Sequence, residues 1–155
     1  MNRTLQTVIA GTALAGTLDI VSAFVFAGMS GMTPAQVMRF VASGPFGDGM
    51  REGGATGVAL GFLTHFSIMA AMVMVFVLAA QRLPALLRNP VLWGAAYGIG
   101  LYLVMYWAVR PIRWPGMWPA LTAWGLGNAL FSHIVCVGIP IALVAARMLR
   151  NARPA

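Results

Sequence analysis

Four long apolar runs constrain this chain more than any other feature of its sequence. They cover about residues 5–28, 56–80, 91–109 and 123–146, and each is close to the roughly 20 residues that a helix needs to cross a bilayer. The whole chain is 60% hydrophobic and only 8% charged, which is too apolar for a soluble domain of this length. We therefore predict an all-α integral membrane four-helix bundle with up-down-up-down topology, formed by residues 1–155 as one domain.

The first run has a second interpretation as a secretory signal peptide. Arg3 supplies a basic start, and the stretch "VSA" that ends at Ala23 is an acceptable cleavage pattern. Asp19 would interrupt the apolar segment of such a peptide. We therefore interpret the first run as a membrane span.

The distribution of arginine predicts the orientation of the four spans. All ten basic residues are Arg, and they are scattered through the connections, which argues against a nucleic-acid-binding patch. With the N-terminus inside, the inner side holds six of them and the outer side four, namely Arg3, Arg82, Arg88, Arg147, Arg150 and Arg153 against Arg39, Arg51, Arg110 and Arg113. This excess predicts that both termini are cytoplasmic, with Trp114, Trp118 and Trp124 at the outer edge.

The connection after the first span is expected to contain a short helix in the membrane interface. Thr33 is a suitable N-cap and Pro34 suits the first helical position, so the helix should run over residues 34–43 and end at Gly44. The stretch "GPFGDGMREGG" that follows is predicted to be a flexible connector, because it is rich in glycine and charge.

Each span carries a column of two small residues and one polar residue, spaced four apart. The columns are Gly11-Ala15-Asp19, Gly57-Gly61-His65, Gly94-Gly98-Tyr102 and Gly125-Ala129-His133. Residues four apart share a helix face, and small residues let membrane helices approach closely, so the polar residues should point into the bundle. The repeated pattern, with "LTHF" beside "FSHI", also indicates a possible internal repeat of a two-helix hairpin.

The four polar residues are expected to meet in the outer half of the bundle. At about 1.5 Å per residue, both histidines lie roughly 12–16 Å below the outer surface, Asp19 lies somewhat nearer the outer face, and Tyr102 lies near the middle. Such a cluster has two interpretations as a ligand site. His65 and His133 would hold haem b from both faces, with Arg51, Arg110 and Arg113 near the propionates, or a zinc or copper ion would be held by His65, His133, Asp19, Tyr102 and Cys136.

Other functions stay open at this stage. The polar cluster is equally well explained as a set of hydrogen bonds between helices that only stabilises the bundle. Transport of a proton, cation or small solute ranks below ligand binding, because only Thr12 and Thr7 continue the polar path toward the cytoplasm. A scaffold or assembly factor, with a second copy or a membrane complex as partner, is a further class. Enzymatic activity is not indicated, since no serine is paired with a base and Asp48 and Glu52 are too few for a hydrolase.

Several stretches of the sequence resemble a known group of proteins. "GTLDIVSA", "VASGPFG", "GFLTHF", "RNPVLWGAAYG" and "HIVCVGIPIALVA" are together similar to a group of small bacterial inner-membrane proteins with four spans and no assigned activity. The similarity covers nearly the whole chain. It implies a four-span fold in the bacterial inner membrane, and it carries over no functional residue.

Overall fold

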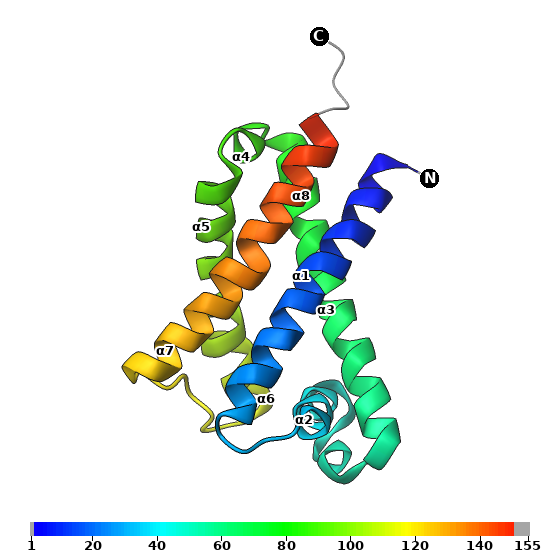
Figure 1. Cartoon of the computed structure of the whole chain (residues 1–155), viewed down its shortest axis with the longest axis vertical. Coiled ribbons are helices and arrows are strands. Elements are labelled where there is room, and N and C mark those ends of the chain that lie inside the picture. The colour runs from blue at the N-terminus through cyan, green and yellow to red at the C-terminus, as the bar shows by residue number, and fades with distance from the viewer. Residues whose placement is uncertain (1, 151–155) are drawn as a thin grey trace.

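Four long helices dominate the computed structural model, which describes residues 2–150 (Figure 1). No strand occurs in this range, so the predicted all-α class is confirmed. Each helix is long and apolar enough to cross a membrane, and their bounds are Arg3–Gly28, Gly54–Arg82, Pro90–Arg113 and Ala123–Arg150. Arg153, which entered the predicted charge balance, lies outside the described residues.

The first and last long helices form the centre of the bundle. Helix α1 (Arg3–Gly28) packs against α3 (Gly54–Arg82) and, on its other side, against the helix formed by α7 (Ala123–Leu130), η3 (Phe131–Gly138) and α8 (Ile139–Arg150). Helix α5 (Pro90–Leu103) packs against η3 and α8. The start of α1, the end of α8 and the short α4 (Ala85–Arg88) lie at one end, and α2 (Pro34–Phe46) lies at the other (Figure 1).

Helix α2 forms where the sequence predicts it, but it is longer than expected. The Thr33 hydroxyl accepts a hydrogen bond from the Gln36 backbone N–H, and the Gln36 side chain accepts one from the Thr33 N–H, so a capping box starts the helix. Gly44 does not end it. The helix continues to Phe46 and stops at Gly47, whose φ of +89° is a conformation that favours glycine.

The prediction of a flexible connector after α2 is wrong for the central residues of that stretch, which form regular structure. Residues Asp48–Glu52 form a 3-10 helix, η1, and α3 begins directly after it at Gly54. The carboxylate of Asp48 is held by residues far away in the chain, described below, and this gives the glycine-rich stretch a fixed geometry.

Glycine allows the closest helix contacts, as the small-residue columns predict for the first and third spans. A Cβ atom added to Gly94 would lie 2.7 Å from Ile139 Cα, and one added to Gly98 would lie 2.7 Å from Ile134 Cα. A Cβ on Gly11 would lie 2.8 Å from Val73 Cγ1. Backbones that approach this closely exclude any larger residue.

The other two columns pack differently from the prediction. Gly61 of α3 abuts the backbone of Met38 in α2 rather than another long helix, because α2 folds back against α3. Gly125 meets only Ala120 and Thr122 of its own preceding segment. The close contact from the last long helix is made instead by Gly138, against Gly94 and Gly98.

Two segments of the long helices are π-helical, and each ends just before a proline. The η2 segment (Val104–Val109) joins α5 to α6 (Arg110–Arg113), which contains Pro111, so the third span continues beyond the predicted end near residue 109. The η3 segment is followed by Pro140. Proline lacks an N–H and its ring crowds the carbonyl four residues earlier, which disfavours the ordinary α-helical bond at that point. Short π-helical insertions in α-helices are frequent at functional sites.

Candidate functional site

Asp19 is the centre of a polar cluster inside the bundle. The other two acidic residues of the chain, Asp48 and Glu52, lie in η1, so Asp19 is the one carboxylate within the four long helices. It is partly buried on α1, close enough to His65 on α3 and His133 on η3 to interact electrostatically with both. An ionisable residue at this depth is costly in a bilayer unless charged or polar groups surround it.

His65 is buried and fixed against α1. Its Nε2 lies 2.9 Å from the carbonyl oxygen of Gly16, and because a carbonyl only accepts, Nε2 donates the hydrogen bond. Gly16 lies three residues before Asp19 on the same helix. This bond therefore keeps the His65 ring beside the turn of α1 that carries the carboxylate.

His133 is held differently, and its Nε2 has no hydrogen-bond partner among residues 2–150. Its Nδ1 donates to the carbonyl of Ala129 at 2.9 Å, one turn earlier in the same helix. The ring centroid lies 6.2 Å from that of Tyr102 and 5.6 Å from that of Tyr106, both edge to face. Nε2 therefore remains available to exchange a proton or bind a ligand.

Three further residues join the cluster that the small-residue columns did not indicate. The Ser22 and Ser132 hydroxyls are 2.7 Å apart and connect α1 to η3. The centroid of the Tyr106 ring lies 5.1 Å from that of Tyr102. The guanidinium carbon of Arg110 lies 4.6 Å from the centroid of the Tyr106 ring. Ser22 is three residues after Asp19, and Tyr106 is four residues after Tyr102. Their spacing along the helix from Asp19 and Tyr102 was therefore the signal in the sequence that could have added them to the cluster.

The predicted metal ligands do not assemble into one set. Within residues 2–150, no group of three or more His, Cys, Asp or Glu side chains is placed to hold a metal ion. Cys136 is buried beside Ser22. The geometry therefore gives the metal hypothesis no support.

The haem arrangement also meets an obstacle. It needs a flat cofactor between the two histidines, but α1, which carries Asp19, packs against both α3 and η3, the segments that carry His65 and His133. The Nε2 atom of His65, the expected axial ligand, is already bonded to Gly16. Of the three arginines predicted near the propionates, Arg110 reaches the cluster through Tyr106, whereas Arg51 and Arg113 do not.

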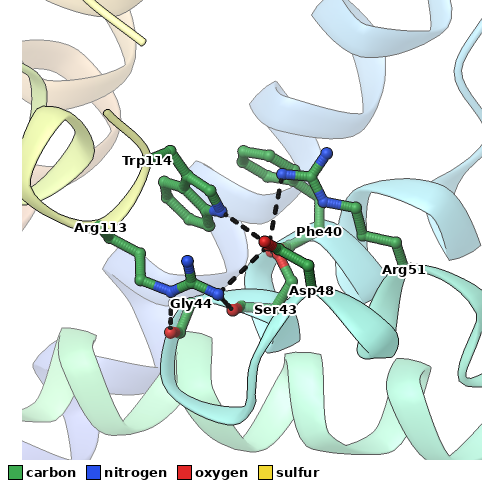
Figure 2. A network of polar contacts seen from close by, with 7 residues as sticks. All are labelled: Phe40, Ser43, Gly44, Asp48, Arg51, Arg113 and Trp114. Carbon is green, nitrogen blue, oxygen red and sulfur yellow. Dashed lines mark hydrogen bonds and ion pairs between the residues drawn. The ribbon is translucent and has the colours of Figure 1, made fainter. Parts of the chain in front are cut away.

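Arg51 and Arg113 belong to a separate network around Asp48, drawn in Figure 2. Asp48 Oδ1 accepts hydrogen bonds from Arg113 Nη2 and Trp114 Nε1, both at 3.2 Å, and Arg51 Nη2 lies 3.7 Å away. Trp114 stacks on Phe40 of α2 at a centroid distance of 4.7 Å. The network joins the end of the third long helix to α2 and η1.

Arg113 also binds the end of α2 directly. Its Nε donates to the Gly44 carbonyl and its Nη2 to the Ser43 carbonyl, both at 2.6 Å (Figure 2). Carbonyls in the last turn of a helix lack intrahelical partners and carry partial negative charge, so a guanidinium is a suitable cap. Arg113 therefore holds the C-terminal end of α2 against the end of the third long helix.

Comparisons with known proteins do not assign the chain to a family. No family model matches it, and searches of curated proteins and of solved structures found no match. The function must therefore be argued from the polar cluster and its surroundings.

Proposed function

We propose that this chain is an integral protein of the bacterial inner membrane with both termini in the cytoplasm. Large apolar side chains are exposed along the long helices, among them Leu14, Val21, Leu63 and Val75, which suits contact with lipid tails. The end of the bundle that carries the termini holds more arginine than the other end, with Arg3, Arg82, Arg88, Arg147 and Arg150 against Arg39, Arg51, Arg110 and Arg113. Arginine excess marks the cytoplasmic side.

A pair of reporter fusions tests this topology. Alkaline phosphatase, which is active only after export, should be inactive when fused after Ala155 and active when inserted after Gly31, in the connection between α1 and α2. A cytoplasmic reporter at the same positions should give the opposite result. Phosphatase activity at the C-terminus would contradict the proposed orientation.

We propose further that the cluster transfers protons within the membrane. The observation that carries this proposal is that Asp19 lies on the helix that packs against both α3 and η3, close enough to His65 and His133 to interact electrostatically with both. A carboxylate and imidazoles that lie near one another can exchange protons near neutral pH, directly or through water, and chains of such groups line proton paths in membrane proteins.

Polar groups extend the cluster toward both ends of the bundle. On the side of α6, Tyr106 connects His133 to Arg110. On the other side, the Thr12 hydroxyl is buried without a hydrogen-bond partner within residues 2–150, two turns from Asp19 on the same face of α1. An unpaired buried hydroxyl is costly unless water or an ion completes it. The Thr12 hydroxyl therefore favours proton transfer over the haem and metal sites that were ranked first from the sequence.

The proposal is tested by proton flux into proteoliposomes. Under a potassium diffusion potential, wild-type protein should acidify the lumen faster than protein-free liposomes, and His65→Ala and His133→Ala should lose most of that rate. Tyr97→Phe is a suitable control, because Tyr97 donates only to the Met72 carbonyl, at 2.8 Å, and its partners in the core are aliphatic or aromatic. Equal rates with and without wild-type protein would contradict the proposal.

Haem b remains a competing proposal for the same residues. Its specific support is Nε2 of His133, which has no hydrogen-bond partner within residues 2–150 and would be a ligand atom. An absorption spectrum of protein purified in mild detergent, from cells given haem precursor, distinguishes the two. A Soret band that vanishes in His133→Ala would favour haem, and a colourless, metal-free protein that conducts protons would favour proton transfer.

A scaffold role makes a different prediction for the cluster. If the cluster only locks the bundle, Asp19, His65, Tyr102 and His133 can be replaced by apolar residues with loss of stability alone. If this variant carries protons at the same rate as wild-type protein, the result would favour the scaffold.

A further inference from the structure

A basic pocket lies at the end of the bundle where α1 begins and α8 ends. Its volume is about 420 Å³, and Arg3, Arg88 and Arg150 all line it. They come from the start of α1, from α4 and from the end of α8, which are far apart in the chain. The fold therefore gathers three guanidinium groups around one cavity.

Nothing in the described part of the chain neutralises these arginines. The ion pairs within residues 2–150 are those of Asp48 with Arg51 and Arg113, at the opposite end. Among the described residues, no carboxylate lines the pocket. The pocket therefore has a strong unbalanced positive charge, and a ligand with negative charge would be complementary to it.

Hydrogen bonds and buried side chains fix the walls of the pocket. Gln81 Nε2 donates to Thr4 Oγ1 at 2.8 Å, which joins α1 to α3 beside the arginines. Arg150 Nε donates to the Ala146 carbonyl at 3.2 Å, and this bond orients its guanidinium. Ala80 and Leu87, both buried, form an apolar base.

Apolar surface continues from the pocket along the neighbouring helices. Leu5 and Ile9 of α1 are 46% and 51% exposed, and Leu78 of α3 is 50% exposed, in the turns next to the pocket. A ligand bound here would thus meet guanidinium groups at one end and hydrocarbon surface at the other. A free anion would use only the first of these features.

We propose that this pocket binds the phosphodiester headgroup of an anionic phospholipid, with the acyl chains along α1 and α3. Guanidinium groups bind phosphate oxygens in a bidentate manner, and basic pockets between membrane helices on the cytoplasmic side are known to take anionic headgroups. The site is independent of proton transfer by the Asp19 cluster, and it requires only that the four helices lie in a membrane.

The test is a lipid titration of the full chain in mild detergent, with bound lipid counted by native mass spectrometry. Wild-type protein should retain phosphatidylglycerol at least tenfold more tightly than phosphatidylcholine. The double variant Arg88→Gln/Arg150→Gln should lose about tenfold in affinity for phosphatidylglycerol. The matched control is Arg82→Gln/Arg147→Gln, which removes the same charge at the same end from residues that do not line the pocket, and it should bind as wild type does.

Three results would overturn the proposal. The first is an equal loss in the control variant, which would mean that general charge attracts the lipid. The second is equal affinity for the two lipids in wild-type protein. The third is displacement of phosphatidylglycerol by millimolar inorganic phosphate, which would make the pocket a free-anion site. If the glutamine variant does not fold, Arg88→Lys/Arg150→Lys keeps the charge but loses bidentate geometry, and it should still bind at least threefold more weakly, whereas wild-type affinity would contradict the proposal.

Discussion

Gly98→Val is expected to lower the melting temperature of the purified protein by roughly 5–10 °C. A Cβ at this position would lie against the His133 carbonyl and 2.7 Å from Ile134 Cα, so backbone atoms of the last long helix would have to move. Overpacking of this kind costs about 1–3 kcal/mol, and more when backbones collide. For a chain of this size, 1 kcal/mol corresponds to about 2–4 °C.

Gly100→Val is the matched control for this prediction. Gly100 lies two residues later in the same helix, and an added Cβ would meet nothing within 4 Å. Both variants change the helix propensity in the same way, so the difference between them isolates the contact with η3. Thermal melting followed by size-exclusion chromatography measures both. Equal melting temperatures would mean that α5 and η3 do not approach each other as described.

Arg113→Gln is expected to release α2 from the rest of the molecule. The substitution removes the two 2.6 Å bonds to the Ser43 and Gly44 carbonyls and weakens the hold on Asp48. Hydrogen bonds from a charged group contribute about 1.5–3 kcal/mol each, but Arg113 is partly exposed, so we expect about 1.5–3 kcal/mol in total. Amide hydrogens of residues 34–46 should therefore exchange roughly 10–100 times faster.

Arg51→Gln is the control for the release of α2. Arg51 contacts the same carboxylate at 3.7 Å and lies over the Phe40 ring, but it donates no hydrogen bond to the end of α2. It is also largely exposed, so its ion pair should contribute little. Hydrogen–deuterium exchange of α2 should change less than threefold. A change as large as that in Arg113→Gln would mean that only the charge of the network matters.

The long helices were predictable because the length of an apolar run is a strong signal. The start of α2 was predictable because Thr33 and Pro34 have specific positional preferences at helix N-termini. The columns correctly placed Gly94 and Gly98 in a close helix contact. These features depend on residues a few positions apart, which a single sequence displays directly.

Features that depend on distant pairing could not be predicted in this way. Asp48 and Arg113 are 65 positions apart, and nothing near either residue indicates the other. Arg51, Arg110 and Arg113 were therefore grouped by their common end of the bundle, although Arg110 alone adjoins the polar cluster. Gly61 likewise has the spacing of a contact between two spans, but the backbone of Met38 in α2 occupies that place.

The π-helical segments were also missed, for a different physical reason. Apolar periodicity does not distinguish a backbone bond to the fourth residue from one to the fifth. In the structure, the Arg110 N–H bonds to the Met105 carbonyl and the Ile139 N–H to the Ile134 carbonyl. Pro111 and Pro140, which follow the two segments, were the visible signs in the sequence.

The central claim of this account is that Asp19 transfers protons together with His65 and His133. Asp19→Asn keeps the shape of the side chain but removes the proton-exchanging carboxyl group, so proton flux in proteoliposomes should fall at least tenfold, toward the rate of protein-free liposomes. Asp48→Asn is the matched control, because it removes a carboxylate outside the four long helices, and it should retain most of the wild-type rate. Flux in Asp19→Asn equal to that in Asp48→Asn, with both variants folded, would contradict the claim.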